Sequence, residues 1–137
     1  MVLVASSCSG IPGTSQASPS AVPSGPPLDA QVALPVGFPS DVPVYAGARL
    51  TAAASFASNG QVTWGLEWET RDAVSRVQAY YSTQLSQGDW TASFTSTTTQ
   101  AFAARFARKS NSHAGGTIAG QSDGGVTRIL LSFASPA

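Results

Sequence analysis

Charge is scarce in this chain. Only 10% of its 137 residues are charged, with seven basic and seven acidic side chains and a formal net charge of zero. A nucleic-acid-binding surface needs a basic excess to displace counterions from phosphates, and a protein held electrostatically on anionic lipid needs a similar excess. The composition therefore predicts neither kind of binding. Serine, threonine, glutamine and glycine supply the polarity instead, which favours an extracytoplasmic setting.

Cysteine and histidine each occur once, as Cys8 and His113. One cysteine cannot form an internal disulfide, so Cys8 is a free thiol, an intermolecular link or a lipid attachment point. With a single histidine, one remote cysteine and scattered carboxylates, no three ligands stand at a recognisable metal-binding spacing. The sequence predicts no metal site and indicates no cofactor.

Residues 120–124, Gly-Gln-Ser-Asp-Gly, match the Gly-x-Ser-x-Gly nucleophile elbow of α/β-hydrolases. An elbow needs a helix after it and the catalytic base later in the chain, whereas here a strand is expected to follow and His113 comes earlier. We expect a glycine-rich hairpin turn. Glu67 and Glu69 stand two residues apart, and we expect them on the solvent face of a strand rather than in an acid–base cleft. The chain is predicted not to be an enzyme.

A sustained helical period occurs in one stretch, from Thr70 to Trp90. Its apolar residues fall on one narrow stripe: Val74, Val77, Tyr81 and Leu85. Thr70 or Asp72 is expected to cap the start of the helix, and Gly88 to end it in the left-handed conformation. A lone amphipathic helix of this length is marginal in water, so its apolar stripe must pack on a sheet.

Alternating apolar and polar residues predict strands on both sides of the helix. Residues 50–57 and 62–69 are expected to form a hairpin with a three-residue loop, Ser58 to Gly60. This register pairs Phe56 with Val62 and places Phe56 on the same inward face as Trp64, whereas a two-residue turn would put the two apolar rows on opposite faces. Further strands are expected over residues 90–95, 102–106, 113–121 and 126–133.

These elements predict an α+β fold: an antiparallel sheet with one amphipathic helix packed on one face, in the order strand-strand-helix-strand-strand-strand-strand, preceded by a disordered tail. Residues 1–8 form a truncated signal-peptide-like segment. Residues 9–33 are dominated by Ser, Pro, Gly and Ala and are predicted to be a disordered tether. Residues 34–137 are predicted to be one domain.

The domain is predicted to open with an extended segment, residues 34–48, which we call the strap. A proline about every four residues removes backbone donors and keeps the preceding residues extended. Its apolar side chains are expected to pin it to the core: Phe38, Val42, Val44 and Tyr45.

Ser6 and Ser7, immediately before Cys8, resemble the lipobox of bacterial lipoproteins, in which the signal peptide is cleaved ahead of the cysteine and the thiol receives diacylglycerol. Ala5 stands where leucine is commonest in that motif, and residues 1–4 contain no basic segment, which an earlier start codon would supply. The alternative is an incidental cysteine in a disordered N-terminus. The resemblance implies a membrane partner, reached through a lipid on Cys8.

A second resemblance covers residues 34–90. Leu-Pro-x-x-Phe-Pro-x-Asp-Val-Pro-Val-Tyr-x-Gly-Ala in the strap, followed by Val-x-x-Tyr-Tyr-x-x-x-Leu-x-x-x-x-Trp at 77–90, looks like small secreted bacterial lipoproteins of unassigned function. It implies a fold and a location in the bacterial cell envelope, lipid-anchored or secreted. It names no catalytic or binding residues.

Two function classes follow. One is a non-enzymatic interaction or sensory module with an unknown protein partner. The other is a carrier of small apolar ligands, with a pocket between helix and sheet lined by Trp64, Trp68, Tyr81 and Phe94. A cavity of at least about 300 Å³ under the helix favours the carrier, and a filled core with an exposed apolar patch favours the module. Tyr80 and Trp90 are expected to form an exposed aromatic edge. The candidate contact residues are Trp64, Trp68, Tyr80, Tyr81 and Trp90.

Overall fold

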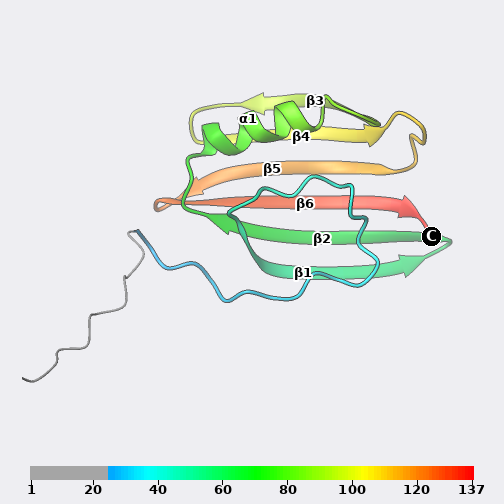
Figure 1. Cartoon of the computed structure of the whole chain (residues 1–137), viewed down its shortest axis with the longest axis horizontal. Coiled ribbons are helices and arrows are strands. Elements are labelled where there is room, and N and C mark those ends of the chain that lie inside the picture. Colours follow the sequence, from blue (N-terminus) through cyan, green and yellow to red (C-terminus); the bar gives the residue numbers. More distant parts are fainter. Residues whose placement is uncertain (1–24) are drawn as a thin grey trace, which may run out of the picture.

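The computed structural model describes residues 25–137, so the signal-like segment, Cys8 and the tether up to residue 24 lie outside the described residues. Six strands and one helix follow one another along the chain: β1 (Arg49–Ser58), β2 (Gln61–Thr70), α1 (Val74–Gln84), β3 (Trp90–Thr97), β4 (Ala101–Arg108), β5 (Gly115–Asp123) and β6 (Val126–Pro136). The strands form a single antiparallel sheet in the order β1-β2-β6-β5-β4-β3 (Figure 1). The predicted α+β class and element order are confirmed.

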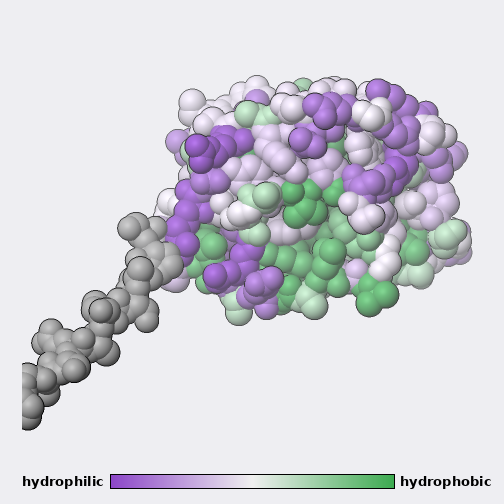
Figure 2. All heavy atoms as spheres, viewed as in Figure 1, coloured by the Kyte–Doolittle hydropathy of each residue, from purple (hydrophilic) through white to green (hydrophobic). Residues whose placement is uncertain are grey.

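Both covering elements lie on the same face of the sheet, which we call the packed face. Helix α1 lies over β4 and β5, and the strap crosses β6 and β2 beside it (Figure 1). The opposite face, which we call the open face, is covered at one end by residues 25–33, which lie over Glu69. Its remaining rows are covered by no part of the chain that the structure describes. Seen from the packed side, hydrophobic residues gather on part of the surface (Figure 2). Val32, Leu34 and Val36, near the start of the described chain, are exposed.

The helix forms where its apolar period predicts. Its stripe of Val74, Val77, Tyr81 and Leu85 is buried against the sheet, as expected. The predicted cap was wrong, because the N-cap residue is Ala73 and makes no side-chain hydrogen bond. The Asp72 carboxylate instead accepts a hydrogen bond from the Tyr45 hydroxyl at 2.6 Å.

The predicted helix stop is right in conformation but not in position. Gly88 is left-handed, with φ 58°, yet the helix ends four residues earlier at Gln84. Gly88 therefore lies in the turn that leads from α1 into β3.

The β1–β2 hairpin differs from the predicted one. Its turn is the two-residue Asn59-Gly60, with φ 52° and 74°, which the Asn-Gly pair adopts at low cost in a type I′ turn. Phe56 pairs with Thr63 and lies on the face opposite Trp64. A bulge between Leu50 and Ala52 shifts the phase of β1, so Leu50 points into the core while Phe56, 67% exposed, points away from it.

Aromatic rings fill the packed face. Phe133, in β6, is fully buried, and its ring centroid lies within 6.0 Å of those of Trp64, Trp90 and Phe106. The Phe102 ring on β4 lies directly against Gly120 of β5, where any side chain would collide with it. Core residues therefore come from alternate positions of β2, β3, β4 and β6, as half-buried strands require.

The strap is held as predicted, with Val42 and Tyr45 buried and Phe38 and Val44 partly buried against the core. Its polar residue Asp41 is also fixed. Arg108 Nη2 donates to Asp41 Oδ1 at 2.8 Å, and the guanidinium lies 4.5 Å over the Trp90 ring. Trp90 Nε1 in turn donates to the Asp41 carbonyl at 3.3 Å.

Residues 25–33, placed by composition in the tether, run along the domain and are hydrogen-bonded to it. Val32 N donates to the Leu50 carbonyl at 2.9 Å, Arg71 Nε donates to the Pro26 carbonyl at 3.0 Å, and Asp29 N donates to Glu69. The ordered part therefore begins before the predicted boundary at residue 34, because backbone groups of this segment find partners in the domain.

Replacing Leu85 by alanine tests the docking of α1. Leu85 is buried at the end of the helical stripe, so Leu85→Ala should lower the free energy of unfolding by about 2–5 kcal/mol in a denaturant titration. The exposed neighbour Ser82, changed to alanine, should alter it by less than about 0.5 kcal/mol. If both variants change the free energy of unfolding by the same small amount, the helix is not docked by this stripe.

Acid should loosen the strap. The hydrogen-bonded Arg108 guanidinium lowers the pKa of Asp41, so this carboxylate stabilises the fold above its unfolded pKa of about 3.9 and ceases to do so as pH falls through its folded pKa. We expect Asp41→Asn to lower the melting temperature near neutral pH and to make it less dependent on pH below about 4. An unchanged acid profile in a scanning-calorimetry series would show that Asp41 is not part of the attachment.

Candidate functional site

The predicted ligand pocket under the helix is filled by side chains. Trp64, Trp68 and Tyr81 are all buried in the core. Two hollows of about 350 Å³ lie at the ends of α1, one lined by Arg71 and Thr127 and the other by Trp90 and Phe94. Neither is lined by Trp64, Trp68 or Tyr81, so the residues expected to form a carrier pocket are not brought together around one.

The expected aromatic edge of Tyr80 and Trp90 is not formed. Trp90 is 6% exposed, packed between Phe106 and Phe133 with Arg108 over its ring. Tyr80 is partly buried, and its hydroxyl donates to the Val44 carbonyl of the strap at 2.7 Å. The strap covers the space in which this edge was expected. Composition alone could not give the path of the strap over the core.

The open face presents a surface of small side chains. The register of the six strands places its residues in rows that cross the whole sheet. The first row is Phe56, Thr63, Ala134, Gly115, Ala107 and Thr91. The second is Ala54, Gly65, Ser132, Thr117, Arg105 and Ser93. The third is Ala52, Glu67, Leu130, Ala119, Ala103 and Ser96.

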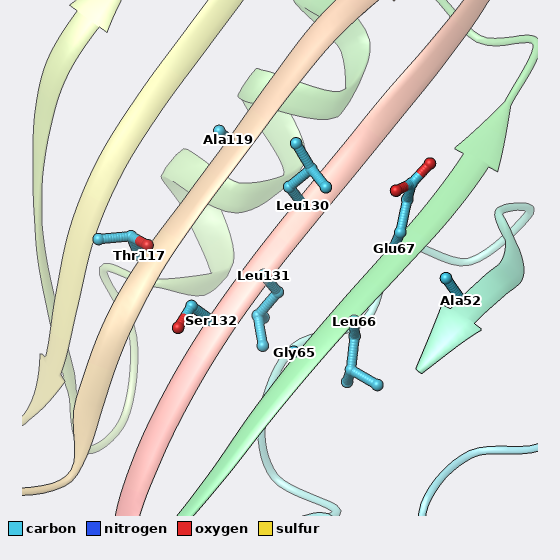
Figure 3. Close-up of a pocket in the computed structure, with 9 residues that line it drawn as sticks. All are labelled: Ala52, Gly65, Leu66, Glu67, Thr117, Ala119, Leu130, Leu131 and Ser132. Atoms are coloured by element: carbon cyan, nitrogen blue, oxygen red, sulfur yellow. The ribbon is translucent and has the colours of Figure 1, made fainter. Parts of the chain in front are cut away.

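A hollow of about 340 Å³ lies on this face over β1, β2, β6 and β5 (Figure 3). Gly65, Ala52 and Ala119 line it, and the side chains of Leu130 and Glu67 stand up beside it, with α1 behind the strands (Figure 3). Leu130 is 43% exposed. The hollow is open rather than enclosed, and its apolar lining carries a single carboxylate, that of Glu67.

Charges on this side are unevenly paired. Arg128 lies among three carboxylates, with Nη1 3.0 Å from Glu67 Oε1, Nη2 3.5 Å from Glu69 Oε1 and Nε 3.5 Å from Asp123 Oδ2. Burial lowers the pKa of Arg128, but these three carboxylates outweigh it and the pKa is raised. Arg105, exposed in the second row, makes no ion pair within residues 25–137.

Both glutamates were expected on the solvent face of a strand, but only Glu67 is exposed to solvent. Glu67 is partly exposed on the open face, whereas Glu69 is 2% exposed. Glu69 Oε2 accepts a hydrogen bond from Asp29 N at 2.9 Å, so residues 25–33 cover it. Both carboxylates are held by Arg128.

The other sequence candidates occupy turns and loops. Residues 120–124 run from the end of β5 into a turn at Gly124-Gly125, both left-handed, and β6 follows, as the hairpin interpretation predicts. His113 is exposed in the loop between β4 and β5. Over residues 25–137 no three His, Cys, Asp or Glu side chains come close enough to hold a metal ion. Nor does the described part of the chain include a helix with the length and apolar character needed to span a membrane.

Sequence reasoning missed the open face. The outward positions of a solvated sheet usually carry long polar or charged side chains. Here they carry alanine, glycine, serine and threonine, and that composition was the available signal. Phe56 and Leu130 stand out from it as large apolar residues.

No protein-family model, curated protein or solved structure matches this chain.

Proposed function

We propose that this chain is a non-enzymatic interaction module of the bacterial cell envelope that binds a protein partner through the open face of its sheet. One contrast carries the proposal. The packed face is filled by buried aromatic residues. On the open face residues 25–33 cover the end at Glu69, while the three rows of mainly small side chains, with Phe56 and Leu130 exposed on them, have no cover within residues 25–137.

Large exposed apolar patches are rare on soluble monomers and mark binding surfaces. The hollow of the open face has a mainly apolar lining, and Leu130 beside it and Phe56 on the same face are exposed. A flat, small-residue face also suits a protein better than a small molecule, because a small ligand is usually enclosed by its site.

We propose further that a lipid on Cys8 tethers the domain to the membrane. The residues Ser6, Ser7 and Cys8 resemble a lipobox, and the strap and helix motifs resemble small secreted bacterial lipoproteins. The neutral charge of the chain offers no electrostatic attraction to lipid, so stable attachment would depend on acyl chains.

A photo-crosslinking side chain at position 130 tests the open face. We expect it to form an adduct with a protein in the native envelope, because Leu130 lies in the centre of the proposed surface. The matched control is the same probe at Val36, an exposed aliphatic position on the strap at the other side of the sheet. Absence of an adduct at position 130, or equal adducts from both positions, would contradict the proposal.

Detergent phase partitioning tests the anchor. We expect the protein from its native host to enter the detergent phase and Cys8→Ala to remain in the aqueous phase, because the variant cannot receive a lipid. Leu130→Lys should still enter the detergent phase, which separates anchoring from partner binding. Unchanged partitioning of Cys8→Ala would refute lipid attachment.

A further inference from the structure

We propose that the partner bound by the open face is a second copy of this chain, packed face to face about a two-fold axis that runs close to the strand direction between β6 and β5. The inference rests on the proposed function of the open face and adds the identity of its partner. The sheet order β1-β2-β6-β5-β4-β3 puts this axis at the centre of the sheet. The rotation then places β6 opposite β5, β2 opposite β4 and β1 opposite β3 of the second copy.

Shape favours this arrangement. The rotation places each row of one copy opposite the same row of the second copy, and it sets large residues against small ones. In the third row, Leu130 faces Ala119 of the second copy, and by symmetry Ala119 faces its Leu130. In the first row, Phe56 faces Thr91 of the second copy. Aligned sheets pack with their strands about 30° apart, so the match is closest at the central strands.

Gly65 is the clearest sign of a close approach from outside the chain. A glycine within a strand costs stability and often marks a place where another molecule comes near the backbone. A Cβ added at Gly65 would meet nothing within 4 Å, so the chain's own packing does not require glycine there. In the proposed dimer, Gly65 faces Arg105 of the second copy.

Charge complements this contact. Glu67 is one row away from Gly65 along β2, a step of about 7 Å, so an arginine lying over Gly65 can reach its carboxylate. Glu67 shares a single guanidinium, Arg128, with two other carboxylates, and Arg105 lacks an ion-pair partner within residues 25–137. The incompletely balanced negative charge of Glu67 and the unpaired positive charge of Arg105 therefore lie on the same face, as self-association requires.

The area of the face is adequate for a weak dimer. Five inter-strand steps of about 4.8 Å and three rows about 7 Å apart outline roughly 350 Å² between backbone positions. The side chains of the rim extend it, as do Arg128, Gln121 and Ala101 of the adjoining row, whose fourth member, Glu69, is covered by residues 25–33. The outline is then roughly 400 Å² before the side chains of the rim are counted, which suits a weak dimer rather than the roughly 800 Å² per partner of a standard protein interface.

A charge exchange tests the arrangement with the full 137-residue chain, in reductant so that Cys8 cannot link two copies. Sedimentation equilibrium should give a dimer for the unchanged chain. Arg105→Glu and Glu67→Arg should each raise the dissociation constant at least about tenfold, because each homodimer then opposes like charges twice. An equimolar mixture of the two variants should recover most of the affinity, since both pairs become opposite in sign.

Gly65→Val gives a second readout that does not depend on charge. Valine suits a strand better than glycine, so the melting temperature of the monomer should be maintained or raised while the dimer is lost. Val36→Thr, on the strap, should leave the dimer intact. A dimer that survives Gly65→Val, or a mixture of charge variants that stays monomeric, would overturn the proposed packing.

The outcomes also separate this inference from the proposed function. If the unchanged chain is monomeric at millimolar concentration while the probe at position 130 captures a different protein, the second copy is the wrong partner and the open face remains a binding surface. If the chain dimerises, no substitution on the open face weakens the dimer, and the probe at position 130 forms no adduct, both proposals fail.

Discussion

The junction of the helix and the strap is the contact on which the rest of this structure depends, because neither element alone covers the packed face. Three tyrosines form it. The rings of Tyr45 and Tyr81 both lie edge-on to that of Tyr80, at 5.2 and 5.1 Å, and Tyr45 N donates to the Tyr81 hydroxyl at 3.2 Å. Burial, together with the hydrogen bond to Asp72, raises the pKa of Tyr45 to about 12, so the hydroxyl keeps the proton that it donates to Asp72 even in moderately alkaline solution.

Covering one face in this way leaves a six-stranded sheet with two unlike surfaces. A single helix of 11 residues and one extended strap are enough for one side, whereas on the other side residues 25–33 cover only the end at Glu69. Antiparallel sheets tolerate such exposure when the outer side chains are polar. Because many of these outer side chains are alanine or glycine, the open face is better suited to a protein surface than to water, which connects the architecture to the proposed role.

The elements could be predicted from periodicity, since buried residues in α1 and in β2, β3, β4 and β6 recur at the spacing of their structure. The β1–β2 register could not, because the two-residue turn puts Phe56 on the open face while the bulge after Leu50 turns Leu50 back into the core, and alternation alone carries no sign of a bulge. The open face was missed for a related reason. Alternation assigns residues to the two sides of one strand but does not show which strands are neighbours, and only the observed register showed that Gly65, Ala119 and Leu130 share one surface.

The unlike character of the two faces can be measured directly by solvent paramagnetic relaxation of methyl groups in dilute protein. Leu130 and Leu131 are neighbours on β6 that point to opposite sides, the first 43% and the second 3% exposed. The account predicts strong relaxation of the Leu130 methyl groups and almost none for those of Leu131. Equal relaxation of both residues would contradict the division of this sheet into a packed and an open face.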